Sequence, residues 1–208
     1  GDAEAELDGV VSELGLALSL GVAEVVLECD LGDREATERA VQEAVLQLGG
    51  LDVVVSNAAL QWVPGHEALL TRWVAALPAG AWLAVQVPGN FGAPSHVLVR
   101  ELAAERGLTL RGGEAVAEPA EYAALLAAAG VEVDVWETTY QQRLTGADPV
   151  LEWIGSTALR PVRDALDGEA YAAFRAELAP RLRAAYPAQP DGTTWFPFRR
   201  IFAVVRIR

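Results

Sequence analysis

The sequence of 208 residues contains no lysine and no methionine, and it has a single cysteine. Without lysine, the chain cannot supply the phosphate-binding lysine of a P-loop, a lysine that forms a Schiff base with pyridoxal phosphate, or a Tyr-x-x-x-Lys catalytic pair. Cys29 has no second cysteine with which to form an intrachain disulfide, and a structural zinc site would need several further ligands. These absences exclude several enzyme classes, and we expect no metal site.

The chain is strongly acidic, with 29 acidic residues against 16 arginines and a net charge of −13. Such a charge disfavours binding to the phosphate backbone of nucleic acids. The charge is uneven, because residues 1–139 contain 22 acidic residues and six arginines, whereas residues 140–208 contain seven and ten. This favours an anionic ligand near the C-terminal third, although helix surfaces that simply differ in charge would give the same pattern.

The hydrophobic content is that of an ordinary globular protein, with 52% apolar and 22% charged residues. No run approaches the roughly 18 uncharged apolar residues that a membrane span needs. No basic segment precedes an apolar one as it would in a signal peptide. We therefore expect a single domain over residues 1–208, located in the cytoplasm and without a membrane partner.

Strand-like and helix-like patterns alternate along the chain. Strands are expected at residues 23–29, 51–56, 81–87, 131–139 and 200–207. Helices are expected at residues 34–48, 67–77, 94–106, 119–130, 149–157, 161–166 and 168–185. This order predicts an α/β fold with an open, mostly parallel sheet, in which ligands bind outside the carboxyl ends of the strands. That rim holds Asp30, residues 57–62 and residues 88–91.

Five segments after residue 51 carry a specific pattern: DVVVSNAALQWVPGH (52–66), AVQVPGNFGAPSH (84–96), EPAEYAALLAAAG (118–130), VWETTYQQRLTGADPVLEWIGSTALRPVR (135–163) and DGTTWFPFRRIFAVVR (191–206). In this order they resemble the trans-aconitate 2-methyltransferase family, and NAALQWV together with FPFRR is a specific combination. The resemblance implies that a methyl group is transferred from S-adenosyl-L-methionine to a carboxylate of a small, anionic polycarboxylic acid.

The resemblance also implies a Rossmann-like fold of the class I methyltransferase type. Its methyltransferase core would span residues 52–139, followed by a helical insert on the substrate side at 140–198. An antiparallel last strand would occupy residues 199–208, and the N-terminal strands would be incomplete.

Residues 1–58 resemble a different family. The run VVLECDLGDREATERAVQEAVLQLGGLDVVVSNA (25–58) is similar to a short-chain dehydrogenase, whose catalytic lysine this chain lacks. The two resemblances meet in one strand, which indicates a chimera, whether by natural recombination, by an error in the gene sequence or by design. We expect the strand at 23–29 to pair with the strand at 51–56. The alternatives are an inactive module that binds adenosine or NAD(P) and a purely structural hybrid.

The cofactor-binding residues that these resemblances imply lie on the rim of the sheet. Both families place an acidic residue at a strand end, where it accepts a hydrogen bond from the adenine amino group. This points to Asp30 and its neighbour Leu31, although Asp30 could instead cap the following turn. The loop after the next strand adds four candidates: Asn57, Ala58, Gln61 and Trp62. Trp62 could equally close the hydrophobic core.

Methyl transfer to a carboxylate depends on alignment more than on acid–base catalysis, so we expect no catalytic residue. A polycarboxylate needs arginine, whose planar guanidinium binds carboxylates through paired hydrogen bonds. The resemblance suggests Arg160 and one of the pair Arg199 and Arg200 as substrate ligands. Two further candidates follow from position: His96, which begins a helix beside the loop at 88–91 and could donate to a carboxylate, and Tyr140, which ends a strand and could hydrogen-bond the substrate. Because Arg199 and Arg200 are consecutive, one should point inward and the other outward. The arginines could instead be solvated or paired with acids, and His96 and Tyr140 could serve packing.

The other histidine and several aromatic residues are assigned to positions without a role in binding. His66 is expected on the surface. Cys29 is expected to be a small buried residue. Four tryptophans are expected in the core: Trp73, Trp82, Trp136 and Trp153.

Both families bind their cofactor with a glycine-rich loop, and neither D-x-G-x-G nor T-G-x-x-x-G-x-G occurs in these 208 residues. Glycines in such loops allow the backbone to approach the cofactor closely. The nearest run, CDLGD (29–33), has one glycine. We therefore predict that this chain binds S-adenosyl-L-methionine weakly or not at all. Calorimetric titration measures this directly, and a low-micromolar dissociation constant would contradict the prediction.

Overall fold

The computed structural model describes residues 39, 42–43, 46–47, 52–110 and 115–208. The chain divides into two compact units, Gly1–Asp52 and Val53–Arg208. The expected helix at 34–48 is described at five positions, all helical. Several predictions lie outside the described residues: the strand at 23–29, its pairing, and the roles of Asp30, Leu31 and Cys29. A single domain over the whole chain stays a prediction.

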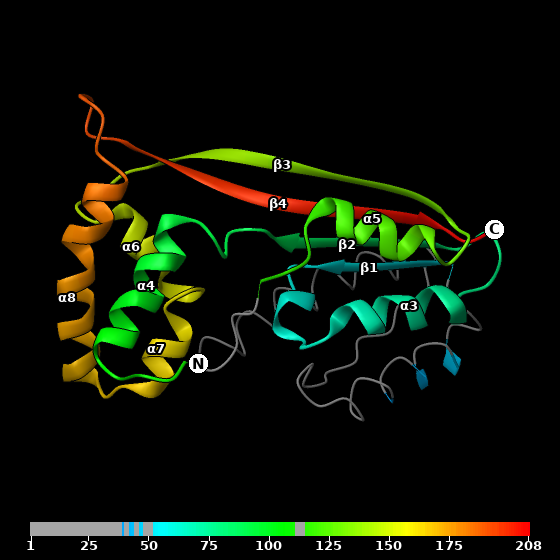
Figure 1. The fold of residues 1–208 in the computed structure, drawn as a ribbon. Coiled ribbons are helices and arrows are strands. Elements are labelled where there is room, and N and C mark those ends of the chain that lie inside the picture. Colours follow the sequence, from blue (N-terminus) through cyan, green and yellow to red (C-terminus); the bar gives the residue numbers. More distant parts are fainter. Residues whose placement is uncertain (1–38, 40–41, 44–45, 48–51, 111–114) are drawn as a thin grey trace. The chain divides into compact units, whose positions relative to one another are not determined.

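The second unit is built on a mixed sheet of four strands (Figure 1). The strands are β1 (Val53–Asn57), β2 (Trp82–Pro88), β3 (Glu132–Leu144) and β4 (Thr194–Arg206), in the order β1-β2-β4-β3. β1 and β2 are parallel, whereas β4 runs antiparallel to both of its neighbours. Three strands therefore share one direction and the last strand opposes them, which confirms the predicted α/β fold with an antiparallel last strand.

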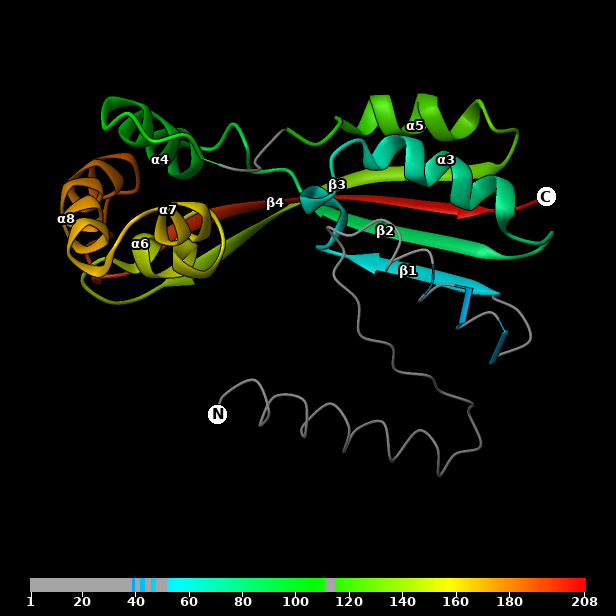
Figure 2. The ribbon, with the colours of Figure 1, turned by 90° about the horizontal axis from the view of Figure 1, so that it is seen from below.

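One face of the sheet forms a hydrophobic core with two helices, α3 (His66–Ala76) and α5 (Pro119–Ala127), as Figure 2 shows. Alternate residues of β2 and β4 point into this core because side chains in a strand alternate between its faces. They are Leu83, Val85, Val87, Ile201, Ala203 and Val205. The backbone N–H of Glu118 and the side chain of Glu121 form half of a capping box that starts α5, and Pro119 fits its first turn.

The opposite face of the sheet exposes large aromatic side chains. Trp82 and Trp136 are 43% and 40% exposed, so the prediction that they lie in the core was wrong. The reason is the strand period of two, which places Trp82 opposite the buried Leu83. Trp136 instead stacks on Phe202, with ring centroids 5.1 Å apart. Trp153 is also partly exposed, whereas Trp73 packs against the core as predicted.

His66 is buried at the start of α3, which contradicts its predicted surface position. Its Nε2 atom is hydrogen-bonded to the Tyr122 hydroxyl in α5. The two residues are 56 positions apart, so the local sequence contained no signal for this contact.

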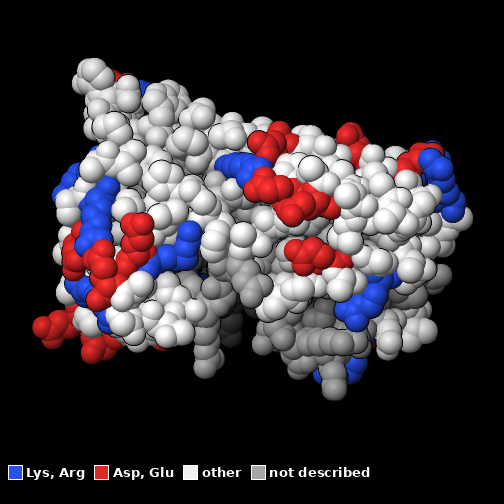
Figure 3. Space-filling model, viewed as in Figure 1, with Lys and Arg blue, Asp and Glu red and all other residues white. Residues whose placement is uncertain are grey.

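A second hydrophobic core lies among helices near the carboxyl end of β3 and the amino end of β4 (Figure 1). The helices are α4 (Pro94–Glu105), α6 (Pro149–Trp153), α7 (Arg160–Ala165) and α8 (Gly168–Ala185), with the short helix η2 (Ile154–Ser156) after α6. The Asp167 carboxylate caps α8 by accepting from the Ala170 N–H at 2.8 Å. Arg181 of α8 bonds to Glu105 and Glu177, and Figure 3 shows acidic and basic side chains side by side over this region.

β3 and β4 are longer than the sequence pattern predicts because they pair with each other from Glu132–Arg206 to Leu144–Thr194. β2 pairs with only part of β4, between Arg206 and Arg200. The remaining part of β4 brings Phe196 into the helical core, where its ring contacts Trp153 and Tyr186. The long strand pair thereby connects the sheet to the second hydrophobic core among the helices.

Replacing Phe196 tests this connection. Phe196 is fully buried, so Phe196→Ala should lower the free energy of unfolding by about 3–5 kcal/mol through lost packing and a residual cavity. The neighbouring Trp195 points to the opposite face and is half exposed. Trp195→Ala should therefore cost about 1 kcal/mol or less. Urea denaturation measures both, and equal losses would contradict this account of the core.

Candidate functional site

A cavity of about 360 Å³ lies within the second unit, at the carboxyl ends of β1 and β2. Its described wall is formed by the loops that follow these two strands, by α4 and the segment after it, by the start of α7 with the residues before it, and by Phe198 of β4. Among the described lining residues, the side chains with polar groups are Gln61, Trp62, Asn90, His96, Arg100 and Thr157. The cavity is in the place where open α/β sheets bind ligands, and the sequence-predicted residues Gln61, Trp62 and His96 line it.

The loop after β1 turns sharply at Ala58, whose φ angle is 52°. Among the described residues, Ala58 is the one residue other than glycine with a positive φ. A side chain in this left-handed region costs about 1–2 kcal/mol. Two hydrogen bonds hold the turn: the Ala58 N–H donates to the Gln86 carbonyl at 2.9 Å, and Gln61 Nε2 donates to the Ala58 carbonyl at 2.6 Å. The turn leads into η1 (Leu60–Trp62) and so places Gln61 and Trp62 at the cavity, whereas Asn57 is exposed at the end of β1.

Gln61 leaves one hydrogen-bonding atom free inside the protein. Its Oε1 atom is buried and has no partner among the described residues. A buried acceptor without a partner costs free energy unless a ligand or water donates to it. The amide oxygen is therefore suited to a hydrogen-bond donor on a bound molecule.

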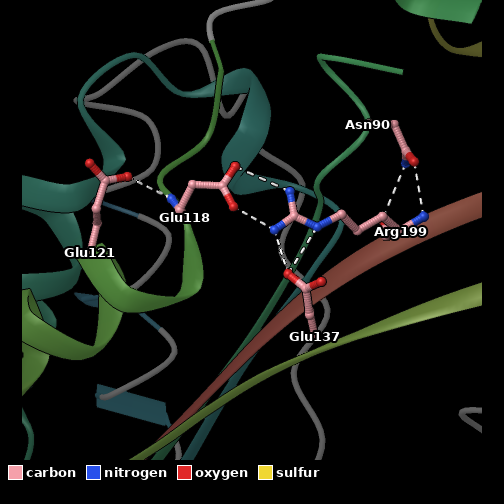
Figure 4. Close-up of polar contacts among 5 residues, drawn as sticks. All are labelled: Asn90, Glu118, Glu121, Glu137 and Arg199. Carbon is pink, nitrogen blue, oxygen red and sulfur yellow. Dashed lines mark hydrogen bonds and ion pairs between the residues drawn. The ribbon is translucent and has the colours of Figure 1, made fainter. Parts of the chain in front are cut away.

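The loop after β2 is fixed by Asn90, whose side chain continues the pairing of β2 with β4. Its Nδ2 donates to the Arg199 carbonyl at 3.1 Å, and the Arg199 N–H donates to its Oδ1 at 2.9 Å (Figure 4). Gly89 beside it donates to the same carbonyl at 3.0 Å. A Cβ at Gly89 would lie 3.1 Å from Ile201 Cδ1, so the close approach of the loop to β4 favours glycine.

The side chain of Arg199 is held by two carboxylates (Figure 4). Its Nη1 donates to Glu118 at 3.1 Å and its Nε to Glu137 at 3.0 Å, and Nη2 reaches both acids. The hydrogen bonds from Arg199 hold the pKa of Glu118 below its usual range, and the two acids raise the pKa of Arg199. The positive charge of the Arg199 guanidinium is thus balanced within the protein by two carboxylates.

The other predicted arginines are not among the lining residues of the cavity. Arg200 is on the opposite face from Arg199, as predicted, where it donates to Gln86 Oε1 and lies over the Phe198 ring. Arg160 is exposed at the start of α7. Tyr140 is exposed on β3, where it pairs with Phe198. None of these residues lines the cavity, and their roles as substrate ligands stay predictions.

Arg100 is a cavity residue that the sequence analysis missed. It follows His96 by four residues in α4, so both side chains lie on one face of the helix. Its guanidinium carbon is 3.8 Å from the centroid of the Phe91 ring. The spacing of His96 and Arg100 in the expected helix at 94–106 is a usable signal, but the excess of arginine over acid at residues 140–208 points to the C-terminal third instead.

His96 is uncharged at neutral pH. Burial, and then the positive charge of Arg100, lower its pKa to about 4. Its Nδ1 atom lies 3.1 Å from the Ser95 hydroxyl. The described cavity wall therefore contains one permanent cation, one neutral imidazole and no carboxylate. Such a wall favours an anion with an apolar body.

In residues 52–110 and 115–208 and the few positions described before them, no group of three or more His, Cys, Asp and Glu side chains could hold a metal ion. Across the same residues, no helix is both long and apolar enough to cross a membrane.

Comparison with known proteins gives a consistent set of relatives. No family model matches the chain. It is 60% identical over 164 residues to a trans-aconitate 2-methyltransferase of Rhodococcus jostii, covering 76% of this chain and 65% of the relative. It is 55% identical over 184 residues to the protein of the same name from Mycobacterium sp. strain KMS, covering 82% and 72%. The chain thus spans about two thirds of the length of these relatives.

Similarity to solved structures is weaker. The YcgJ protein of Bacillus subtilis aligns with a TM-score of 0.45 and 8% identity, covering 85% of this chain and 80% of that protein. A methyltransferase from Bacillus halodurans aligns with a TM-score of 0.44 and 11% identity, covering 74% and 63%.

The lowered pKa of His96 predicts a pH dependence of stability. Since the unfolded chain protonates this residue near 6.5 and the folded one near 4, the unfolded state binds more protons between these values. Its contribution to stability is therefore complete above pH 6.5 and is lost as the pH falls toward 4, with a slope of at most about 1.4 kcal/mol per pH unit. His96→Gln should flatten this part of the curve. Denaturation midpoints from pH 4 to 7 test it, and identical slopes in both proteins would contradict it.

Proposed function

Because the chain belongs to the trans-aconitate 2-methyltransferase family, we propose that it transfers a methyl group from S-adenosyl-L-methionine to a carboxylate of a small polycarboxylic acid such as trans-aconitate. The membership rests on the relative from Mycobacterium, of which the chain covers 72% at 55% identity. The donor, the acceptor and the activity itself are part of the proposal.

The observation that carries the proposal is the composition of the cavity wall. A carboxylate is already a nucleophile at neutral pH, so the site needs to orient the acid rather than deprotonate it. The wall supplies a guanidinium from Arg100 and a neutral imidazole from His96, with apolar groups elsewhere. No carboxylate of the described wall would repel the substrate.

The residues at the end of β1 fit part of the proposed cofactor. The buried, unpartnered Oε1 of Gln61 can accept from an ammonium or hydroxyl group, both of which S-adenosyl-L-methionine carries. Trp62 offers a partly exposed ring beside it. When bound, the cofactor supplies an electrophilic methyl group on a sulfonium. We keep Asn57 and Ala58 as further cofactor residues, together with Asp30 and Leu31, which lie outside the described residues.

The direct experiment is a transfer assay with the chain, S-adenosyl-L-methionine carrying an isotopically labelled methyl group, and trans-aconitate. Because weak cofactor binding is predicted, the cofactor is supplied in large excess. Mass spectrometry should detect a labelled mono-methyl ester, and the heat-denatured chain should form none. Absence of ester under conditions in which calorimetry detects cofactor binding would contradict the proposed activity.

Filling the cavity should block the reaction. Ala158 lies on the cavity wall and is only partly buried, so Ala158→Phe inserts a ring into the substrate volume. A forced clash of this kind costs about 1–3 kcal/mol, which corresponds to a loss in kcat/KM of roughly five- to 150-fold. Ala165→Phe is the matched control, because Ala165 is exposed at the end of α7. Equal activity of the two variants would exclude this cavity as the site.

A further inference from the structure

The arginines near the last strand are occupied by other groups. Arg199 is bound by Glu118 and Glu137, and a substrate carboxylate would have to displace two acids that already satisfy its donors. Arg200 donates to Gln86 on the opposite face of the sheet. A guanidinium that binds a polycarboxylate should instead be open to the cavity and free of internal acids.

Arg100 has these properties. It lies on the cavity wall and forms no ion pair within the ranges that the structure describes. Its guanidinium lies over the face of the Phe91 ring, 3.8 Å from the centroid. A stacked guanidinium uses its face for the ring, and its N–H donors, which lie in its plane, remain available for an anion. Partial burial lowers its pKa from the ordinary value, so the desolvated cation gains from a carboxylate partner.

His96 is one helical turn before Arg100 and faces the same cavity. The Ser95 hydroxyl lies at hydrogen-bond distance from its Nδ1 atom. When that hydroxyl donates to Nδ1, the proton of the neutral ring is on Nε2, which can then donate to an oxygen of the ligand. The pair thus offers a charged fork and a neutral donor from one helix face.

We propose that Arg100 and His96 bind a carboxylate group of the substrate, with Arg100 stacked on Phe91 as the charge-bearing ligand. This assignment rests on the proposed function, since it names the groups that recognise the acid in that same cavity. The apolar remainder of the wall, which includes Val99, Leu108 and Phe198, receives the carbon skeleton.

The two histidines of the chain make the proposal measurable by NMR. His96 reports on Arg100, and His66 is buried against Tyr122 in the other core, where it serves as an internal reference. Trans-aconitate should shift the imidazole signals of His96 and leave those of His66 in place. Because the bound carboxylate offsets the charge of Arg100, it should also raise the pKa of His96, which Arg100 lowers in the free protein.

Substitution of Arg100 separates its role from a general effect of charge. Arg100→Gln should weaken trans-aconitate binding by about ten- to 100-fold, the range for loss of charge-assisted hydrogen bonds. Arg100→Lys keeps the positive charge but not the planar guanidinium, so its affinity for trans-aconitate should lie between those of the parent chain and Arg100→Gln. Arg72→Gln is the matched control, because Arg72 is exposed on α3 and the same charge is lost. Its affinity should stay within about twofold of the parent chain.

Three results would overturn the assignment: no shift of His96 at saturating trans-aconitate, an Arg100→Gln affinity equal to that of the parent chain, or equal losses in Arg100→Gln and Arg72→Gln. An unchanged His66 signal in each variant shows that the fold is intact, and Arg100→Lys supplies the comparison if Arg100→Gln fails to fold. Binding through Arg100 without ester formation would contradict the proposed function and leave this assignment standing. Full transfer activity in Arg100→Gln would contradict this assignment alone.

Discussion

The guanidinium of Arg199 joins segments of the chain that are far apart in the sequence. Its side chain binds Glu118 at the start of α5 and Glu137 in β3, which are 81 and 62 positions away. Its main chain holds Asn90, 109 positions away, at the end of β2. Partly exposed ion pairs add little to stability by Coulomb attraction alone. The importance of Arg199 is geometric, because its side chain fixes Glu118 and Glu137 beside β4 while its main chain holds the Asn90 loop, which carries Phe91 into the cavity wall.

This arrangement also determines where positive charge is available. The chain carries a net charge of −13, and arginines such as Arg181 and Arg106 are paired with acids on the helix surfaces. The charge of Arg199 in the last strand is balanced by acids in the same way. Arg100 is left as the permanent cation of the described cavity wall. An acidic protein can thus present a local site for an anion, because the described cavity wall holds Arg100 and no carboxylate.

The sequence predicted the α/β class and most element positions, since these depend on local periodicity; the expected helix at 168–185 matches α8. It also placed Gln61 and Trp62 on the rim where the cavity lies, because residues after parallel strands meet at one edge. His96, a candidate from its position at a helix start, lines the same cavity. It failed where distant partners decide. The two acids that bind Arg199 come from distant segments, so no local pattern identified them, and the role of Arg199 as a substrate ligand stays a prediction. The burial of His66 depends on Tyr122, and the length of β4 depends on β3.

The most direct test of this account is a crystal structure of the chain with trans-aconitate bound. The account predicts a substrate carboxylate within hydrogen-bond distance of the Arg100 guanidinium, with Phe91 beneath it. Arg199 should keep both Glu118 and Glu137 as in the free protein. A substrate carboxylate bound to Arg199 or Arg200, with the cavity beside α4 left empty, would contradict it.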